Sequence, residues 1–218
     1  SGVVTALTET EVTIGGGLSG GTLDAWTIGD DYTITYRSHR QLYYSTADGT
    51  DLAGTALNAA WDDTYDDQNP AWSPDGGYIA FETTRNGNAD IYTLESANPS
   101  TTKNLTEFVV LFATRPTWSP DSAQVAFQSK HPVDTNPEKI WRIDAFQSDP
   151  VSPVAVTSAA NTSSNNDLEP AWSPDGSEIA FRGGAAGTAI YAAPADSATP
   201  GAVRTIAAGV AGGANHEP

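Results

Sequence analysis

The chain has 218 residues, of which 39% are hydrophobic and 17% are charged, and its formal net charge at pH 7 is -17. Such an excess of carboxylates repels nucleic-acid phosphates and anionic lipid headgroups, so we expect no nucleic-acid partner. The sequence has no cysteine, which excludes disulfides and thiolate chemistry, and no apolar run long enough to form a membrane span. We therefore expect one large or two small globular domains that favour cations and basic partners.

The N-terminal segment, residues 1–23, differs in pattern from the rest of the chain. Residues 3–8 and 11–14 are rich in β-branched and apolar side chains, which predicts two short strands. Residues 15–21 are glycine-rich and predict a flexible link. A strand on such a link can close a ring of blades or pair with the open edge of a neighbouring subunit. We assign residues 1–23 to ring closure or strand exchange.

From residue 24 onward one pattern recurs four times. It reads Pro-x-Trp-Ser-Pro-Asp-Gly followed by Ile-Ala-Phe, with a decayed first copy and with Ser122 and Val125 in place of the glycine and the isoleucine in the third copy. The equivalent tryptophans lie 46, 46 and 54 residues apart, at Trp26, Trp72, Trp118 and Trp172. This period is typical of propeller blades.

The residues that recur in each repeat have physical roles. Proline presets φ, aspartate accepts from nearby backbone N–H groups, and glycine tolerates positive φ, so Ser-Pro-Asp-Gly predicts a tight turn between two strands. The tryptophan before the turn is a large apolar plate suited to packing between blades. We expect Ser122 to cost some stability or to force a slightly different loop.

Further apolar patches follow each turn, separated by Gly, Asn, Asp, Ser and Pro, and they predict four strands in each repeat. The predicted fold class is all-β, a β-propeller of four-stranded antiparallel blades, with four repeats visible. The blades are expected at residues 24–69, 70–115, 116–169 and 170–218.

The repeat resembles the TolB-type family of WD-like, Trp-Ser-Pro-Asp-Gly β-propellers. Residues 70–106 match nearly throughout, since Asp90-Ile91-Tyr92 and Asn104-Leu105-Thr106 follow the turn and the Ile-Ala-Phe strand, whereas residues 24–60 match weakly. Such propellers usually have six to eight blades, so the resemblance implies that blades are missing. The chain is a fragment, closes as a small ring, or is completed by copies of itself. The repeat serves binding proteins, peptidase domains and polysaccharide lyases alike, so it implies little about activity.

The residue just before each motif proline recurs at one structural position. The first strand of a blade lies nearest the axis, so these residues should cluster around one mouth of the central channel. Polar groups that converge there form a candidate ligand site, and the alternative is solvated loop residues. The predicted site residues are Asn69, Arg115, Glu169 and Glu217.

An acidic loop precedes the second blade. Hard cations such as Ca²⁺ take several oxygen ligands, so its four carboxylates form a possible calcium site, although their spacing does not match an EF-hand. The alternative is a solvated acidic loop. The carboxylates belong to Asp62, Asp63, Asp66 and Asp67.

No catalytic constellation is visible, and no two of the three histidines have metal-ligand spacing. We therefore expect a non-enzymatic propeller exported to the periplasm, the cell surface or the medium, which serves as a protein- or glycan-interaction or scaffold module and can assemble with copies of itself. One alternative is a subunit of an extracellular filament. The other is the propeller fragment of a larger peptidase or polysaccharide lyase.

Overall fold

A computed structural model describes part of the chain, which divides into two compact units, Ser1–Ser38 and His39–Pro218. The described residues are 4–5, 11–12, 40, 42–44, 55–56, 65–107, 111–130, 137–146, 152–158, 166–183, 189–196 and 202–207. In the first unit β1 (Val4–Thr5) pairs antiparallel with β2 (Glu11–Val12), where the sequence predicted two strands. The predicted boundary after residue 23 lies outside the described residues and stays a prediction. Among the described residues no helix is long and apolar enough to span a membrane.

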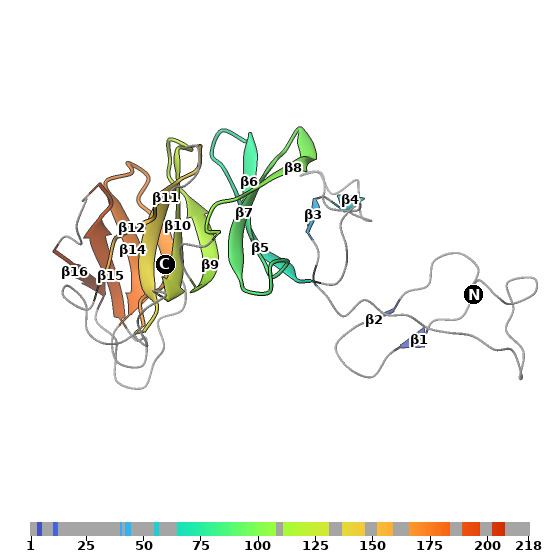
Figure 1. Cartoon of the computed structure of the whole chain (residues 1–218). Coiled ribbons are helices and arrows are strands. Elements are labelled where there is room, and N and C mark those ends of the chain that lie inside the picture. Colours follow the sequence, from blue (N-terminus) through green and yellow to red (C-terminus); the bar gives the residue numbers. More distant parts are fainter. Residues whose placement is uncertain are drawn as a thin grey trace, which may run out of the picture. The chain divides into compact units, whose positions relative to one another are not determined.

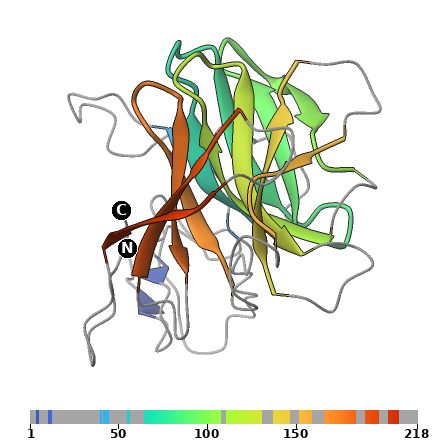
Figure 2. The same cartoon turned by 90° about the vertical axis from the view of Figure 1, so that its left-hand side faces the viewer.

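The second unit contains three four-stranded antiparallel sheets, each a meander in chain order. They are the predicted second, third and fourth blades, and each begins a few residues earlier than the sequence predicted. Figures 1 and 2 show the three sheets following one another from green to red. Their strands are β5 (Asp67–Trp72), β6 (Tyr78–Thr83), β7 (Asp90–Glu95) and β8 (Asn98–Asn104); β9 (Leu111–Trp118), β10 (Gln124–Lys130), β11 (Lys139–Asp144) and β12 (Val154–Ala155); and β13 (Leu168–Trp172), β14 (Glu178–Gly183), β15 (Ala189–Pro194) and β16 (Arg204–Ala207).

The first blade is described only in part. Its β3 (Tyr43–Tyr44) pairs antiparallel with β4 (Thr55–Ala56), where the repeat places the third and fourth strands. The backbone N–H of Asp67, in the second blade, donates to the carbonyl of Arg40 at 2.9 Å. The same bond joins the later blades, from Ala113 to Ala89 at 2.8 Å and from Asp167 to Glu138 at 2.9 Å. At this contact the decayed first repeat therefore keeps the register of the others.

The Ile-Ala-Phe segment of each second strand forms the core between blades. Side chains alternate across a strand, so Ile and Phe face the preceding blade while Ala faces the next one. The phenylalanines Phe81, Phe127 and Phe181 are fully buried. Phe127 belongs to a cluster with Ala80 and Ile91 of the second blade. In the same way Phe81 shares a cluster with Leu42 of the first blade. Burial of the phenylalanine therefore stabilises the packing of each blade against the preceding one.

In the second blade most of the last apolar patch follows the sheet, whereas in the fourth blade most of it lies within β16, as the sequence predicted. β8 ends at Asn104, and the following Leu105 is buried. The hydroxyl of Thr106 accepts from the backbone N–H of Ile91 at 3.0 Å. In the third blade the hydroxyl of Thr157 accepts from Ile140 in the same way, at 2.9 Å. A threonine side chain thus replaces a backbone ladder bond at this end of the sheet.

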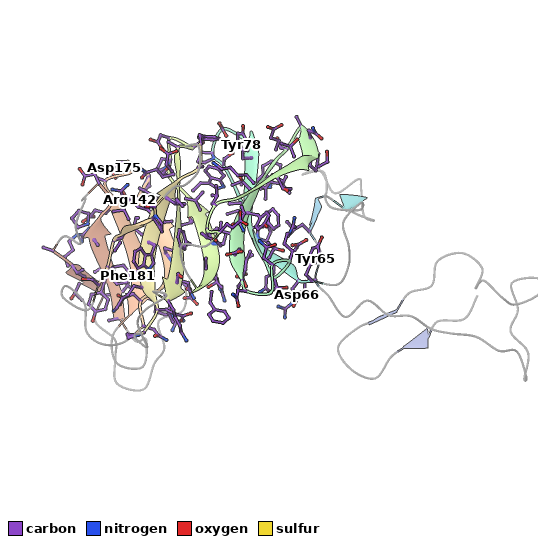
Figure 3. The ribbon with its side chains drawn as sticks, in the orientation of Figure 1. Tyr65, Asp66, Tyr78, Arg142, Asp175 and Phe181 are labelled. Carbon is purple, nitrogen blue, oxygen red and sulfur yellow. The ribbon has the colours of Figure 1, made fainter. Side chains whose placement is uncertain are left out.

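The two ends of the sheets carry different parts of the repeat. The Ser-Pro-Asp-Gly turns lie at one end, where Figure 3 labels Tyr78 and Asp175. The first strands begin near the opposite end, where Tyr65 and Asp66 are labelled. We call these the turn end and the mouth end.

The predicted turn is present in all three blades. Gly76 and Gly176 have φ values of 73° and 74°, and Ser122 adopts the same conformation with a φ of 61°. The predicted alternative of a different loop is therefore wrong, and the predicted cost in stability, now that of a serine in the left-handed region, stays a prediction. Its hydroxyl accepts from the backbone N–H of Asp75, in the neighbouring blade, at 3.1 Å. This bond between blades offsets part of the cost of the conformation.

The aspartate of each turn is held in its charged form. In the fourth blade the hydroxyl of Ser173 donates to Asp175 at 2.6 Å and the backbone N–H of Ser177 donates at 3.0 Å. These hydrogen bonds lower the pKa of Asp175 from 3.8 to about 2. Hydrogen bonds from the equivalent serine hydroxyl and, to a smaller extent, from a backbone N–H also lower the pKa of Asp75 and of Asp121.

We expect these turns to make folding sensitive to acid. A carboxyl group with a lowered pKa in the folded state contributes stability that is present above its unfolded pKa and is lost as pH falls through the folded value. For Asp175 this window runs from its ordinary pKa of 3.8 down to about 2. In Asp175→Asn, the free energy of unfolding, measured with urea, should depend less steeply on pH in this window. The difference in slope should correspond to at most about one proton taken up on unfolding. An unchanged slope would contradict the role of this turn.

Candidate ligand site at the channel mouth

Three of the four predicted site residues come together at the mouth end. Asn69, Arg115 and Glu169, which we call the mouth residues, lie on β5, β9 and β13, the first strands of consecutive blades. They line one hollow of about 270 Å³, the mouth hollow. The rest of its lining consists of the motif prolines and one alanine, namely Pro70, Pro116, Pro170 and Ala171. Glu217 lies outside the described residues, and ligand binding at the mouth stays a prediction.

The mouth residues share an unusual backbone conformation. Their φ values are 51°, 56° and 56° in chain order, although none is a glycine. Each lies at a register shift of the first strand against the second, for example between Gln68 and Ala71 in the second blade. Such strain costs about 1–3 kcal/mol per residue and persists only where the surroundings enforce it, often at functional sites. A bulge also redirects a side chain away from the alternation of the sheet.

A second set of polar residues forms hydrogen bonds with the mouth residues, and sequence reasoning missed it. These are Glu82, Gln128 and Arg182, each of which directly follows the phenylalanine of Ile-Ala-Phe. A polar residue at the end of a core strand in every repeat is the signal that could have revealed them. Because they occupy equivalent positions but differ in charge, they give each blade a different chemistry at the same place.

Glu82 joins the second and third blades. Only 4% of this residue is exposed, so its carboxylate needs donors from the protein. One oxygen, Oε2, accepts from Asn69 Nδ2 at 2.8 Å and from the backbone N–H of Arg115 at 3.4 Å. Gln128 repeats the second bond, since its Oε1 accepts from the backbone N–H of Glu169 at 2.8 Å. An acceptor in one blade therefore holds the strained mouth residue of the next.

The fourth blade reverses the chemistry of this pair. Arg182 donates to both carboxylate oxygens of Glu169, from Nε at 2.8 Å and from Nη2 at 3.1 Å. This fork of hydrogen bonds raises the pKa of Arg182 and fixes the Glu169 side chain. Arg115 differs, because it is exposed and its guanidinium has no hydrogen-bond or ion-pair partner within the described part of the chain. It is thus the mouth cation left available to a ligand.

The mouth hollow has a neighbour on the side of the first blade. This second hollow, of about 490 Å³, is lined by two of the mouth residues together with Glu82 and Arg40. Gln68 and Thr114 complete its lining. Asn69 and Arg115 face both hollows, so a ligand that contacts them has room to extend in either direction.

The predicted calcium ligands divide into two groups. Asp62 and Asp63 lie outside the described residues. Asp66 accepts from the backbone N–H of Arg40 at 2.7 Å, and the buried Asp67 pairs with Arg85 at 3.2 Å. Within the described residues, no group of three carboxylate, histidine or cysteine side chains could hold a metal ion. The calcium site stays a prediction, whereas a structural role of Asp67 follows from its ion pair.

The fold and the mouth together define a class of protein. Three four-stranded antiparallel meanders that pack in sequence through their Ile-Ala-Phe faces form part of a β-propeller, as the repeat predicted.

Comparison with known proteins agrees on the fold. No family model and no curated protein matches the sequence. The structure of a putative TolB from Agrobacterium tumefaciens is similar, with a TM-score of 0.54 and 22% identity over 72% of this chain and 54% of that one. A puromycin-hydrolyzing peptidase from Mycobacterium tuberculosis is also similar, with a TM-score of 0.55 and 14% identity over 75% of this chain and 29% of that one.

These similarities confirm the resemblance to TolB-type propellers at the level of the fold alone. The chain spans about half the length of the TolB structure and under a third of the peptidase. Since a TolB structure and a peptidase match equally well, the fold does not decide between binding and catalysis.

Proposed function

We propose that this chain is an exported, non-enzymatic β-propeller module that binds a protein partner at the mouth hollow. The observation that carries the proposal is the repeated strained backbone of Asn69, Arg115 and Glu169, which presents three different polar side chains to one hollow. Export is supported by the acidic, cysteine-free composition and by the TolB-type repeat. Assembly of the module with copies of itself is a further expectation from the sequence.

The chemistry of the mouth favours a polypeptide over a glycan. Sugar sites commonly offer an aromatic platform, but among the described residues that line the mouth hollow none is aromatic. Arg115 is the available cation, and its planar fork suits a carboxylate of the partner. Asn69 and the backbone around the prolines add hydrogen-bonding groups. We therefore expect a protein segment with an acidic side chain or a free C-terminus.

Charge reversal at the mouth tests the proposal. Arg115→Glu should fold, because Glu169 adopts nearly the same φ at the equivalent position. It should weaken partner binding at least about tenfold, since an unfavourable charge pair at an interface costs more than 1.4 kcal/mol. Arg204→Glu makes the same change of charge on the outer strand β16 and serves as the control.

The measurement is quantitative mass spectrometry of proteins captured from an extract of the source organism on wild-type, Arg115→Glu and Arg204→Glu baits. The proposal predicts a partner that is retained by wild type and Arg204→Glu but lost with Arg115→Glu. Equal capture by all three baits would contradict it. A glycan array probed with the same proteins reveals whether the ligand is instead a sugar.

A further inference from the structure

The junction between the second and third blades is narrowed by aromatic side chains at the turn end, where a hollow of about 220 Å³ remains beside Tyr78 and Phe146. Phe146, which follows the third strand of the third blade, packs edge-on against Tyr78 of the second blade, with ring centroids 5.1 Å apart. Both rings lie 6.3 Å from the indole of Trp118. Trp118 is only 5% exposed, and its Nε1 donates to the carbonyl of Ala71 at 3.1 Å.

The next junction has the same backbone but different side chains. Gln124 occupies the place of Tyr78 as the first residue of the second strand, and Asp196 occupies the place of Phe146. Trp172 takes the position of Trp118. Its Nε1 is buried without a hydrogen-bond partner among the described residues, so the bond that anchors Trp118 is missing here. The two rings that narrow the earlier junction are therefore absent from this one.

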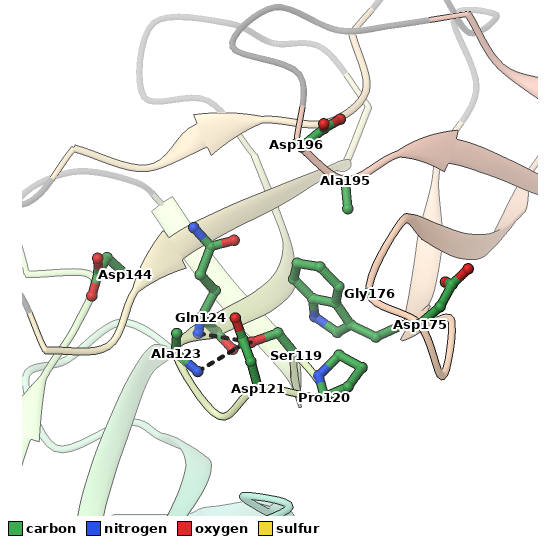
Figure 4. Close-up of a pocket in the computed structure, with 11 residues that line it drawn as sticks. Ser119, Pro120, Asp121, Ala123, Gln124, Asp144, Asp175, Gly176, Ala195 and Asp196 are labelled. Carbon is green, nitrogen blue, oxygen red and sulfur yellow. Dashed lines mark hydrogen bonds between the residues drawn. The ribbon is translucent and has the colours of Figure 1, made fainter.

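The result is a hollow of about 560 Å³ between the third and fourth blades, the inter-blade hollow. Its volume is in the range of sites for small ligands. Trp172, Pro120 and Ala195 contribute apolar surface to its lining. Figure 4 shows four carboxylates on different sides of it, belonging to Asp121, Asp144, Asp175 and Asp196.

The charge of this hollow is strongly negative. Asp121 and Asp175 are held ionised by the serine and backbone hydrogen bonds of their turns, which lower the pKa of both. Among the described residues, one cation contacts this lining from the third blade: Arg142 donates from Nη1 to Gln124 Oε1 at 3.2 Å and is attracted by Asp196. Four carboxylates against one guanidinium leave a net negative site around an indole.

The carboxylates surround the hollow and do not converge on one point. Within the described residues no group of three could hold a metal ion, so the complementary ligand is larger than a bare cation. Organic cations fit this surface, because an ammonium or guanidinium group pairs with carboxylates while its alkyl stem packs on an aromatic face.

We propose that the inter-blade hollow over Trp172 binds an organic cation, either a free polyamine or the Lys or Arg side chain of a peptide. This site lies at the turn end and is independent of the mouth.

The test is a titration of the ¹⁵N-labelled full chain, followed by NMR at the indole N–H of Trp172, which is assigned by its loss in Trp172→Phe. The probes are spermidine and the peptide acetyl-Gly-Lys-Gly-amide, with the Nε-acetylated peptide as the neutral control. A saturable shift of the Trp172 signal with either cationic probe, but not with the neutral one, supports the site. The probe that binds more tightly identifies the source of the cation. No saturable shift up to millimolar probe, or equal binding of the neutral peptide, overturns the proposal.

Two variants make the result specific to the hollow. Gln124→Tyr/Asp196→Phe copies the narrower junction, whose hollow is about 220 Å³, and should weaken binding more than the loss of one carboxylate does. Asp196→Asn removes one carboxylate with little change in shape and should weaken binding about threefold. Glu107→Gln removes the same charge from an exposed position outside the hollow and should leave binding unchanged. Equal affinity of Asp196→Asn and Glu107→Gln would show that only the net charge matters and would overturn the assignment.

Discussion

Replacing Lys139 by methionine should destabilise the protein by about 3–5 kcal/mol, because it removes one side of a buried ion pair. Lys139 Nζ lies 3.0 Å from Asp167 Oδ2, and the two side chains are only 8% and 2% exposed. The pair joins β11 of the third blade to the residue that precedes β13 of the fourth. Loss of this ion pair therefore weakens the junction between two blades.

The double variant Lys139→Met/Asp167→Leu should recover most of that loss, since a matched apolar pair is often as stable as a buried ion pair. The preceding junction supports this expectation, because it has Asp90 and Ala113 at the equivalent positions and forms without such a pair. Urea unfolding followed by circular dichroism measures both effects. Arg204→Ala, which breaks an exposed pair with Glu178, is the control and should cost much less. A single variant no less stable than this control would contradict the role of the buried pair.

Phe127→Ala should cost about 3–5 kcal/mol, through the lost burial of the ring and the cavity that remains. Phe127 is 0% exposed and lies in the cluster that joins the second and third blades. Since the neighbouring sheets hold the cavity open, the site has little freedom to collapse. The loss should appear as a lower urea midpoint.

Phe146→Ala provides the matched comparison at the same junction. Phe146 is 52% exposed, so its truncation removes less surface from contact and should cost about 1 kcal/mol. If the two truncations cost the same, the Ile-Ala-Phe strand would not be the core of the junction.

The blades could be predicted from the sequence because their signals are local. Ser-Pro-Asp-Gly specifies a turn by the conformations of its own residues, and the turn recurs even where Ser122 replaces glycine. The alternation in Ile-Ala-Phe predicts a strand with two buried faces. The end of the blade was harder to predict, because Leu105 is buried after the strand has ended and the hydroxyl of Thr106 replaces the ladder bond.

For the mouth, the sequence predicted that the residues cluster but not their backbone conformation or the side chains that support them. Its position follows from the residue before each motif proline, which the repeat places at one end of every first strand. The positive φ of Asn69 and the support from Glu82 depend on a register shift between strands, which has no local sequence signal. The inter-blade hollow was missed for a related reason, since it requires Gln124 and Asp196, far apart in the sequence, to meet over one tryptophan.

Site-specific photo-crosslinking tests most directly whether the mouth binds a partner. A benzophenone amino acid would replace Pro70, which is exposed and lines the mouth hollow, or Pro74, which is exposed in the turn that follows the same strand. Circular dichroism would verify that both proteins fold. We expect irradiation in a source extract to link a partner protein to the chain labelled at position 70, with loss of that product when Arg115→Glu is added. Crosslinks from position 74 and none from position 70 would contradict binding at the mouth.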